Sequence, residues 1–198
     1  MALDLVHDLQ RAYRKTVDSM SRPGLITNIK AQADKVDLEI GCFKSTVVLV
    51  QMLFDTEVTF KVVSKREAEI TKLLNQLTYA KAAEAQTADF ILVLRDAGPF
   101  GLEKALIAAC PGDLTDPHKS STIIVEADAL SNERDLALAG PGIDAESHIK
   151  VQTTGNWVGL RAEKNSEYPL GIEIIFTDSD HNLLCIPRTT QIVKQVVG

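Results

Sequence analysis

The sequence has few cysteines, and their number is odd. Of its 198 residues only three are cysteine, Cys42, Cys110 and Cys185, and each lies in or beside an apolar run. Three thiols cannot all pair within one chain, and buried free thiols are typical of proteins that fold in a reducing cytosol. We therefore expect free cysteines and a cytoplasmic protein.

Long apolar runs and basic blocks are also missing. No segment reaches the roughly 18 consecutive apolar residues that a membrane helix needs. The N-terminus carries acidic residues and His7 instead of the basic-then-apolar pattern of a signal peptide. The net charge is −6, without a basic block. This composition argues against a membrane or a nucleic acid as a partner.

The common motifs of catalysis and nucleotide binding are absent as well. The sequence has no GxGxxG loop, no GxxxxGK[ST] loop and no GxSxG elbow. Its four histidines are scattered along the chain, at His7, His118, His148 and His181. We therefore expect no metal site built from neighbouring residues, and the sequence alone identifies no catalytic residue.

What is present is the patterning of a mixed α/β protein. The chain is long enough for one domain or two very small ones, and the absence of a linker favours a single domain over residues 1–198. The apolar patterns predict strands at residues 36–40, 58–63, 90–94, 122–126 and 136–139. They predict helices at residues 5–20, 67–77, 101–110 and 154–164, whereas residues 45–54 fit a buried helix or a strand. Because the order lacks a clean βαβ rhythm, we expect a single α/β domain with a mixed β-sheet flanked by helices.

Two of these helices carry specific end signals. Asp4 is placed to cap the first, and Pro23 with Gly24 ends it. Its apolar residues recur every three or four positions and predict one buried stripe, made of Leu5, Leu9, Ala12, Tyr13, Val17 and Met20. Ser64 and Glu67 fit a capping box for the helix at 67–77.

The stretch 168–190 predicts a β-hairpin that ends in a charged segment. Ile172, Ile174 and Phe176 alternate with their neighbours as in a strand, a turn cluster fills 178–182, and 183–186 is a second apolar run. Pro187 ends the hairpin. Arg188, Thr189 and Thr190 then place a permanent cation and two hydroxyls at a strand end, a set that can hold an anion or a carbonyl group.

Three other positions are candidates, each with a structural alternative. Arg22 precedes Pro23 and Gly24, which a helix stop explains fully. Gly140 and Gly142 could let the backbone approach a phosphate or ribose, or could simply form a tight turn. Arg95 follows an apolar strand, where α/β proteins place sites, but it could equally be half of a surface ion pair.

Three segments together resemble one protein family. They are Met20–Gly24 (MSRPG), Leu136–Ile143 (LALAGPGI) and Pro169–Thr190 (PLGIEIIFTDSDHNLLCIPRTT). In order and approximate spacing they resemble the PhnH family, a subunit of the bacterial carbon–phosphorus lyase system for phosphonate breakdown. The resemblance implies a fold like a degenerate pyridoxal-phosphate-dependent transferase. It points to Arg188, Thr189 and Thr190 as the leading ligand-binding residues, followed by Arg22, Gly140 and Gly142, whereas Arg95 is a candidate only from its place at a strand end.

The resemblance also implies a function shared among subunits. Together they transfer a phosphonate to the ribose of ATP, displace adenine and form a ribose 1-phosphonate 5-triphosphate. Partners would be the other subunits, a second copy in a homodimer, and ATP or a phosphonate as ligand. Because the chain has no CxxC-type cluster, it is not the iron–sulfur subunit that later breaks the carbon–phosphorus bond. The alternatives are a non-catalytic scaffold subunit and a stand-alone small-molecule enzyme.

No cofactor is expected. A lysine that forms a Schiff base with pyridoxal phosphate needs a pocket that lowers its pKa. The lysines of the later half, Lys150, Lys164 and Lys194, lie among polar neighbours. We therefore expect that no pyridoxal phosphate is bound covalently.

Overall fold

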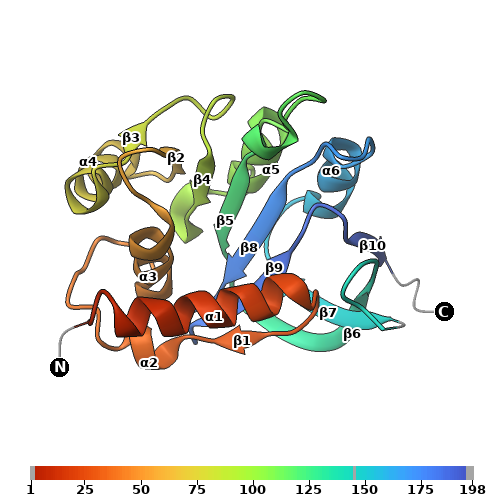
Figure 1. Ribbon diagram of the computed structural model, residues 1–198, viewed down its shortest axis with the longest axis horizontal. Coiled ribbons are helices and arrows are strands. Elements are labelled where there is room, and N and C mark those ends of the chain that lie inside the picture. Colours follow the sequence, from red (N-terminus) through yellow and green to blue (C-terminus); the bar gives the residue numbers. More distant parts are fainter. Residues whose placement is uncertain (1–2, 145, 195–198) are drawn as a thin grey trace.

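The computed structural model of the protein, which describes residues 3–144 and 146–194, is built on a seven-stranded mixed sheet (Figure 1). The strand pairs from β3 at one edge as far as β8 are parallel, and the pairs that include β9 are antiparallel. The strands in order across the sheet are β1 (Thr27–Asn28), β9 (Asn182–Ile186), β8 (Glu173–Thr177), β5 (Thr122–Glu126), β4 (Phe90–Val93), β2 (Thr59–Val63) and β3 (Lys81–Ala82).

Helices cover both faces of this sheet, so the molecule has three layers (Figure 1). One face packs against α1 (His7–Ser21), α2 (Lys30–Ala33), α3 (Lys44–Leu53) and α4 (Glu67–Thr78). The other packs against α5 (Gly101–Ala108), α6 (Trp157–Lys164) and a small antiparallel sheet of β10 (Gln191–Lys194), β6 (Ala129–Ala139) and β7 (Ser147–Gln152). Ile123 and Val125 of β5 lie in one core and Ile124 in the other. Continuous apolar strands are expected where both faces of a sheet are buried.

These features confirm the predicted α/β class and most of the predicted elements. The apolar run at 90–94 is an interior strand, and the ambiguous run at 45–54 is helix α3. Strands β8 and β9 form the predicted hairpin, with Ile174 opposite Ile186. The three cysteines are free thiols, as expected, with Cys185 fully buried.

The strand predicted at 36–40 is wrong. This segment joins α2 to α3 with no ladder partner among the described residues. Val36 and Ile40 are buried in the helical layer, whereas Leu38 is 42% exposed. The alternating pattern therefore reflects a loop that inserts two residues, four positions apart, into the core.

The predicted buried stripe of the first helix is only partly right: Ala12 is buried and Leu9 and Met20 pack partly against the core, but the other three residues are exposed. Leu5, Tyr13 and Val17 are 62%, 54% and 43% exposed. The buried face is instead small and polar, made of Asp8, Ala12, Thr16 and Ser19. Ser19 accepts a hydrogen bond from the Cys185 amide of β9 at 2.9 Å, so short side chains let α1 lie close to the sheet.

One helix cap is confirmed and one is wrong. Asp4 accepts hydrogen bonds from the amides of Val6 and His7 at 2.8 and 2.9 Å. Ser64, in contrast, accepts from the Arg66 amide and donates to Asp96, while Glu67 forms an ion pair with Lys61. The capping box does not form because these partners occupy both of its side chains.

Candidate functional site

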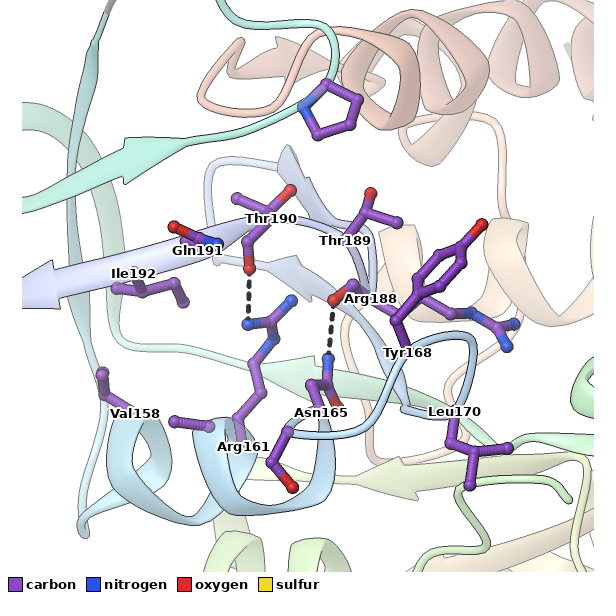
Figure 2. Close-up of a pocket in the computed structure, with 13 residues that line it drawn as sticks. Val158, Arg161, Asn165, Tyr168, Leu170, Arg188, Thr189, Thr190, Gln191 and Ile192 are labelled. Atoms are coloured by element: carbon purple, nitrogen blue, oxygen red, sulfur yellow. Dashed lines mark hydrogen bonds between the residues drawn. The ribbon is translucent and has the colours of Figure 1, made fainter. Parts of the chain in front are cut away.

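The candidate site is a cavity of about 610 Å³ between α6, the segment that leads from β9 into β10, and the tip of the β6–β7 loop (Figure 2). Arg188, Thr189 and Thr190 line it, as do Arg161 of α6 and Asn165 at the C-terminal end of that helix. The structure thus gathers the predicted segment 188–190 at a cavity of the size that small ligands use. The other lining residues are Pro141, Val158, Ala162, Ser166, Tyr168, Leu170, Gln191 and Ile192.

Arg161 is the buried cation of this site, and sequence reasoning missed it. Only 2% of the residue is exposed. Its guanidinium donates to the carbonyl oxygens of Thr190, at 3.0 Å, and Pro187, while its Nε has no partner among the described residues. Burial lowers the pKa of Arg161 to about 10. In the sequence, Arg161 is a single arginine in a predicted helix of mixed apolar and polar residues. Such arginines are common on exposed helix faces, so nothing in the sequence indicated its burial.

Asn165, the residue that follows the last turn of α6, holds the same segment. Its Nδ2 donates to the carbonyl oxygens of Arg188 at 3.1 Å and Ile172 at 3.0 Å, and its Oδ1 accepts from the Ile172 amide. Arg161 and Asn165 together fix the backbone at Pro187, Arg188 and Thr190. The conformation of the segment 187–190 is therefore set by α6 and not by the hairpin alone.

Arg188 does not present the free cation that its sequence position suggested. Its guanidinium donates to the carbonyl oxygen of Pro117 at 2.7 Å and lies 3.4 Å from a carboxylate oxygen of Glu173. The side chain is 21% exposed. In Figure 2 it runs past Tyr168 and away from Arg161. Arg188 therefore lines the cavity while its charge is engaged by the fold.

The two threonines differ from each other. Thr189 is exposed, whereas Thr190 is 3% exposed and its Oγ1 has no hydrogen-bond partner among the described residues. Figure 2 shows the Thr190 carbonyl group directed at Arg161. Thr190 thus contributes a carbonyl that positions Arg161 and a hydroxyl that the fold leaves unused.

The glycines of the β6–β7 loop connect the other two candidate segments. A Cβ on Gly140, whose φ is +128°, would meet the carbonyl oxygen of Thr189 at 3.0 Å. A Cβ on Gly142, whose φ is +82°, would lie 2.2 Å from the carbonyl oxygen of Ser21. The loop is therefore wedged between the segment 188–190 and the end of α1. Close packing accounts for both glycines.

Arg22 lies on the outer side of the same loop. It forms an exposed ion pair with Asp18 at 3.1 Å, and it borders a shallow hollow of about 470 Å³ shared with Gly142. Gly24 has a φ of +96°, as a helix stop requires. The structure thus brings Arg22 and Gly142 together at a hollow that Arg161 does not line.

Arg95 belongs to a different place, at the carboxyl end of β4. It pairs with Asp128 at 3.5 Å, and its guanidinium lies over the ring of Phe43 at 5.6 Å. Beside it Glu126 is 7% exposed and accepts hydrogen bonds from Phe43, Thr46 and the Arg95 amide. Burial raises the pKa of Glu126. These bonds tie the start of α3 to the sheet, which is a structural role.

Histidines and lysines supply no evident reaction centre. No three His, Cys, Asp or Glu side chains among the described residues are grouped to hold a metal. His181 Nδ1 lies 3.3 Å from Ser45 Oγ, but Ser45 is fully buried and cannot reach a substrate. Glu133 accepts a hydrogen bond from Lys150 and raises its pKa, and Lys164 donates to a backbone carbonyl. The Lys194 side chain lies outside the described part.

Comparison with known proteins places the chain in a family. Residues 2–193 match the family described as "Bacterial phosphonate metabolism protein (PhnH)". A putative C-P lyase subunit protein HtxG of Stutzerimonas stutzeri is 26% identical over 186 residues, which cover 92% of this chain and 85% of that protein. The alpha-D-ribose 1-methylphosphonate 5-triphosphate synthase subunit PhnH of Rhizobium meliloti (strain 1021) is 26% identical over 203 residues, 97% of this chain and 94% of that protein. The chain therefore belongs to the PhnH family of bacterial phosphonate metabolism proteins.

Proposed function

We propose that this chain is a subunit of the carbon–phosphorus lyase system for organic phosphonate catabolism, and that it acts with its sibling subunits in the cytoplasm. The joint reaction is the transferase step that forms ribose 1-phosphonate 5-triphosphate from ATP and a phosphonate. The family match over residues 2–193 carries this proposal. The names of both relatives support it, since each is called a subunit. No described helix has the length and apolarity to cross a bilayer.

Within the assembly, the chain contributes a ligand site rather than a complete catalytic set. The cavity at Thr189, Thr190 and Arg188 is the site, closed on one side by the loop at Gly140. Arg22 and Gly142 border the neighbouring hollow, and Arg95 lies apart from both. The ligand is a phosphonate or ATP, because a cation and hydroxyl groups suit the oxygens of either.

The site uses no pyridoxal phosphate. The mixed sheet between helical layers is compatible with a degenerate transferase fold of that class, but no lysine is among the residues that line the cavity. The raised pKa of Lys150 is the opposite of what a Schiff-base lysine needs.

Assembly uses the outward face of α1. Val6, Tyr13 and Val17 are 70%, 54% and 43% exposed, and they lie seven and four residues apart on one side of the helix. Leu9 and Met20, next to them on the helix, are partly buried against the core of the helical layer and border the exposed stripe. An apolar stripe on a helix that has already packed its polar face is the arrangement expected of a subunit interface. The occupant is a sibling subunit; self-association into a homodimer is the secondary mode.

The test is co-purification of the tagged full chain with the proteins encoded beside it. Wild type should retain a sibling subunit, and Val17→Glu should lose it because a charge enters an apolar contact. Arg14→Glu is the control, since Arg14 is exposed on the same helix outside the stripe. If both variants retain the siblings as well as wild type does, the α1 interface is rejected. If wild type retains none, the subunit proposal itself fails.

A scaffold subunit without a ligand is the second candidate, favoured by the α1 stripe alone. It predicts that substitutions at the cavity leave phosphonate metabolism intact while those at Val17 abolish it. A stand-alone enzyme would show the reverse.

A further inference from the structure

Both positive charges in the wall of the cavity are engaged by the fold. Arg161 is 2% exposed, and its guanidinium donates to two backbone carbonyl oxygens. The Arg188 guanidinium donates to the carbonyl oxygen of Pro117 and lies against Glu173. Among the described residues, no other charged side chain lines the cavity. A phosphate or phosphonate group that entered it would lose water without gaining a free cation, which costs free energy.

The side chains that remain open to a ligand are uncharged. Tyr168, Thr189 and Gln191 line the cavity and are exposed, and no other described residue forms a hydrogen bond with their side-chain polar atoms. Leu170 and Ile192 add partly buried apolar surface to the wall. Apolar walls with a few polar groups are typical of sites for small organic ligands. The cavity therefore favours an uncharged ligand or the uncharged part of a larger one.

Tyr168 narrows the class of ligand. At 80% exposure it is the most exposed large apolar or aromatic side chain among the described residues. Figure 2 shows its ring extending from the loop that follows α6, away from that helix. An exposed ring at the edge of a cavity can stack on the flat face of a nucleobase, whichever base it is. Gln191 adds a donor and an acceptor on one amide, the combination that pairs with the edge of adenine.

We propose that the cavity binds the base and ribose of a nucleoside, with the base stacked on Tyr168, and that it holds no phosphate or phosphonate group. Gln191 and Thr189 supply hydrogen bonds to the base and the sugar. The volume of about 610 Å³ lies in the range of small-ligand sites. The nucleoside site follows from the cavity alone; that the ligand is ATP, bound by its adenosine part, rests on the proposed function. The phosphates then extend out of the cavity, where a sibling subunit has to supply their cations.

Tyr168→Ala tests the stacking contact. Calorimetry on the full chain should show adenosine and ATP bound with similar affinity, because the phosphates meet no free cation, and methylphosphonate not bound. Tyr168→Ala should weaken adenosine binding about tenfold, the loss expected for one base stacked on an aromatic ring. Phe100→Ala is the matched control, since Phe100 is 62% exposed and does not line the cavity. It should bind adenosine as wild type does.

Ala162→Leu tests the cavity without a change at Tyr168. Ala162 is exposed on α6 and lines the cavity, so a leucine there takes up space that the ligand needs. The affinity for adenosine should fall by a similar factor, while the melting temperature changes little because the position is exposed. Glu163→Leu is the control, since Glu163 is exposed on the same helix but does not line the cavity. It should leave the affinity for adenosine unchanged.

Three results would contradict this assignment. Binding of ATP without binding of adenosine, or binding of methylphosphonate that Ala162→Leu weakens, would show that the cavity takes the oxyanion and would overturn the ligand class. Absence of binding by all three compounds would overturn the site. Wild-type affinity for adenosine in both Tyr168→Ala and Ala162→Leu would place the nucleoside elsewhere and would also overturn it. The subunit proposal is judged separately, by co-purification.

Discussion

Arg188 is held against Glu173, with its Nε and Nη2 both 3.4 Å from one carboxylate oxygen, and the same guanidinium donates to the carbonyl oxygen of Pro117 at 2.7 Å. The residue that the sequence presented as an exposed clamp thus ties the end of the hairpin to the loop before β5. This relationship changes what a substitution at Arg188 should do.

Arg188→Lys should lower the stability of the fold, in addition to any effect that it has on activity. Lysine cannot reproduce the bonds to Pro117 and Glu173 together, and a hydrogen bond from a charged group contributes about 1.5–3 kcal/mol. The melting temperature should therefore fall by about 3–12 °C for a chain of this size.

Arg66→Lys is the control for Arg188→Lys, because Arg66 pairs with Glu69 on the surface and is 46% exposed. Its melting temperature should change little, since exposed ion pairs contribute about 0–1 kcal/mol. Equal melting curves for wild type and Arg188→Lys would show that these bonds do not stabilise the fold and that the Arg188 guanidinium is available to bind a ligand.

Gly142→Ala tests the wedge between the β6–β7 loop and α1. The new Cβ would lie 2.2 Å from the Ser21 carbonyl oxygen and would also require a positive φ, so the backbone must shift. We expect a loss of more than about 2 kcal/mol, from the strained φ and the clash together, measured as a lower urea midpoint.

Gly98→Ala isolates the conformational part of that loss. Gly98 has a φ of +79°, but a Cβ there would meet no heavy atom of the described residues within 4 Å. With a ψ of 175° it lies in a region that is essentially restricted to glycine, so its cost from backbone strain alone should be about 1–3 kcal/mol. A Gly142→Ala variant no less stable than Gly98→Ala would show that the loop does not press on α1.

The contribution of Glu126 to the free energy of unfolding should be largest at acidic pH and should fall as the pH rises. Burial raises its pKa above the unfolded value, so the folded chain holds the proton more tightly. This contribution is complete below the unfolded pKa and is lost as the pH rises through the folded pKa. Urea unfolding of wild type and Glu126→Gln from pH 4 upward should show wild type losing stability relative to the variant.

Asp8 has the opposite sign and serves as the comparison. The Lys35 hydrogen bond lowers the pKa of Asp8, so its contribution is present above the unfolded pKa and is lost as the pH falls through the folded pKa. Asp8→Asn should therefore remove part of the acid sensitivity. The assignment for Glu126 fails if the two variants change with pH in the same direction.

One domain over residues 1–198 and the absence of covalent pyridoxal phosphate remain predictions. Limited proteolysis should yield no stable half-length fragment, and two resistant fragments would indicate two domains. The purified protein should show no visible absorption band that borohydride abolishes. Such a band would identify a Schiff-base lysine.

The elements that could be predicted are those whose neighbours are close in sequence or whose burial is complete. The run at 90–94 is apolar on both faces, and the hairpin of β8 and β9 has its turn beside it. Strands β1 and β10 could not be predicted, because each is defined by a distant partner: Thr27 of β1 pairs with Leu183, and Gln191 of β10 pairs with Ala139. Strand β7 was missed although its partner β6 is close in sequence.

The candidate site was predictable only in part, for the same physical reason. The segment 188–190 was found because a strand end places its side chains in one region. Arg161 was missed because its burial depends on the carbonyl groups of Pro187 and Thr190, 26 and 29 residues away. The burial of the apolar stripe of α1 was predicted only in part, because an apolar pattern shows which face of a helix avoids water but not which surface covers it. In our proposal, that surface belongs to another chain.

The most direct test of the central claim is growth on methylphosphonate as the sole source of phosphorus, in a bacterial strain from which its own member of this family has been deleted. The gene for this chain, supplied with its operon neighbours, should restore growth on methylphosphonate, and omission of this gene alone should abolish it, while growth on inorganic phosphate is unaffected in both cases. Equal growth on methylphosphonate with and without this gene would contradict the proposal that the chain is a working subunit of phosphonate breakdown.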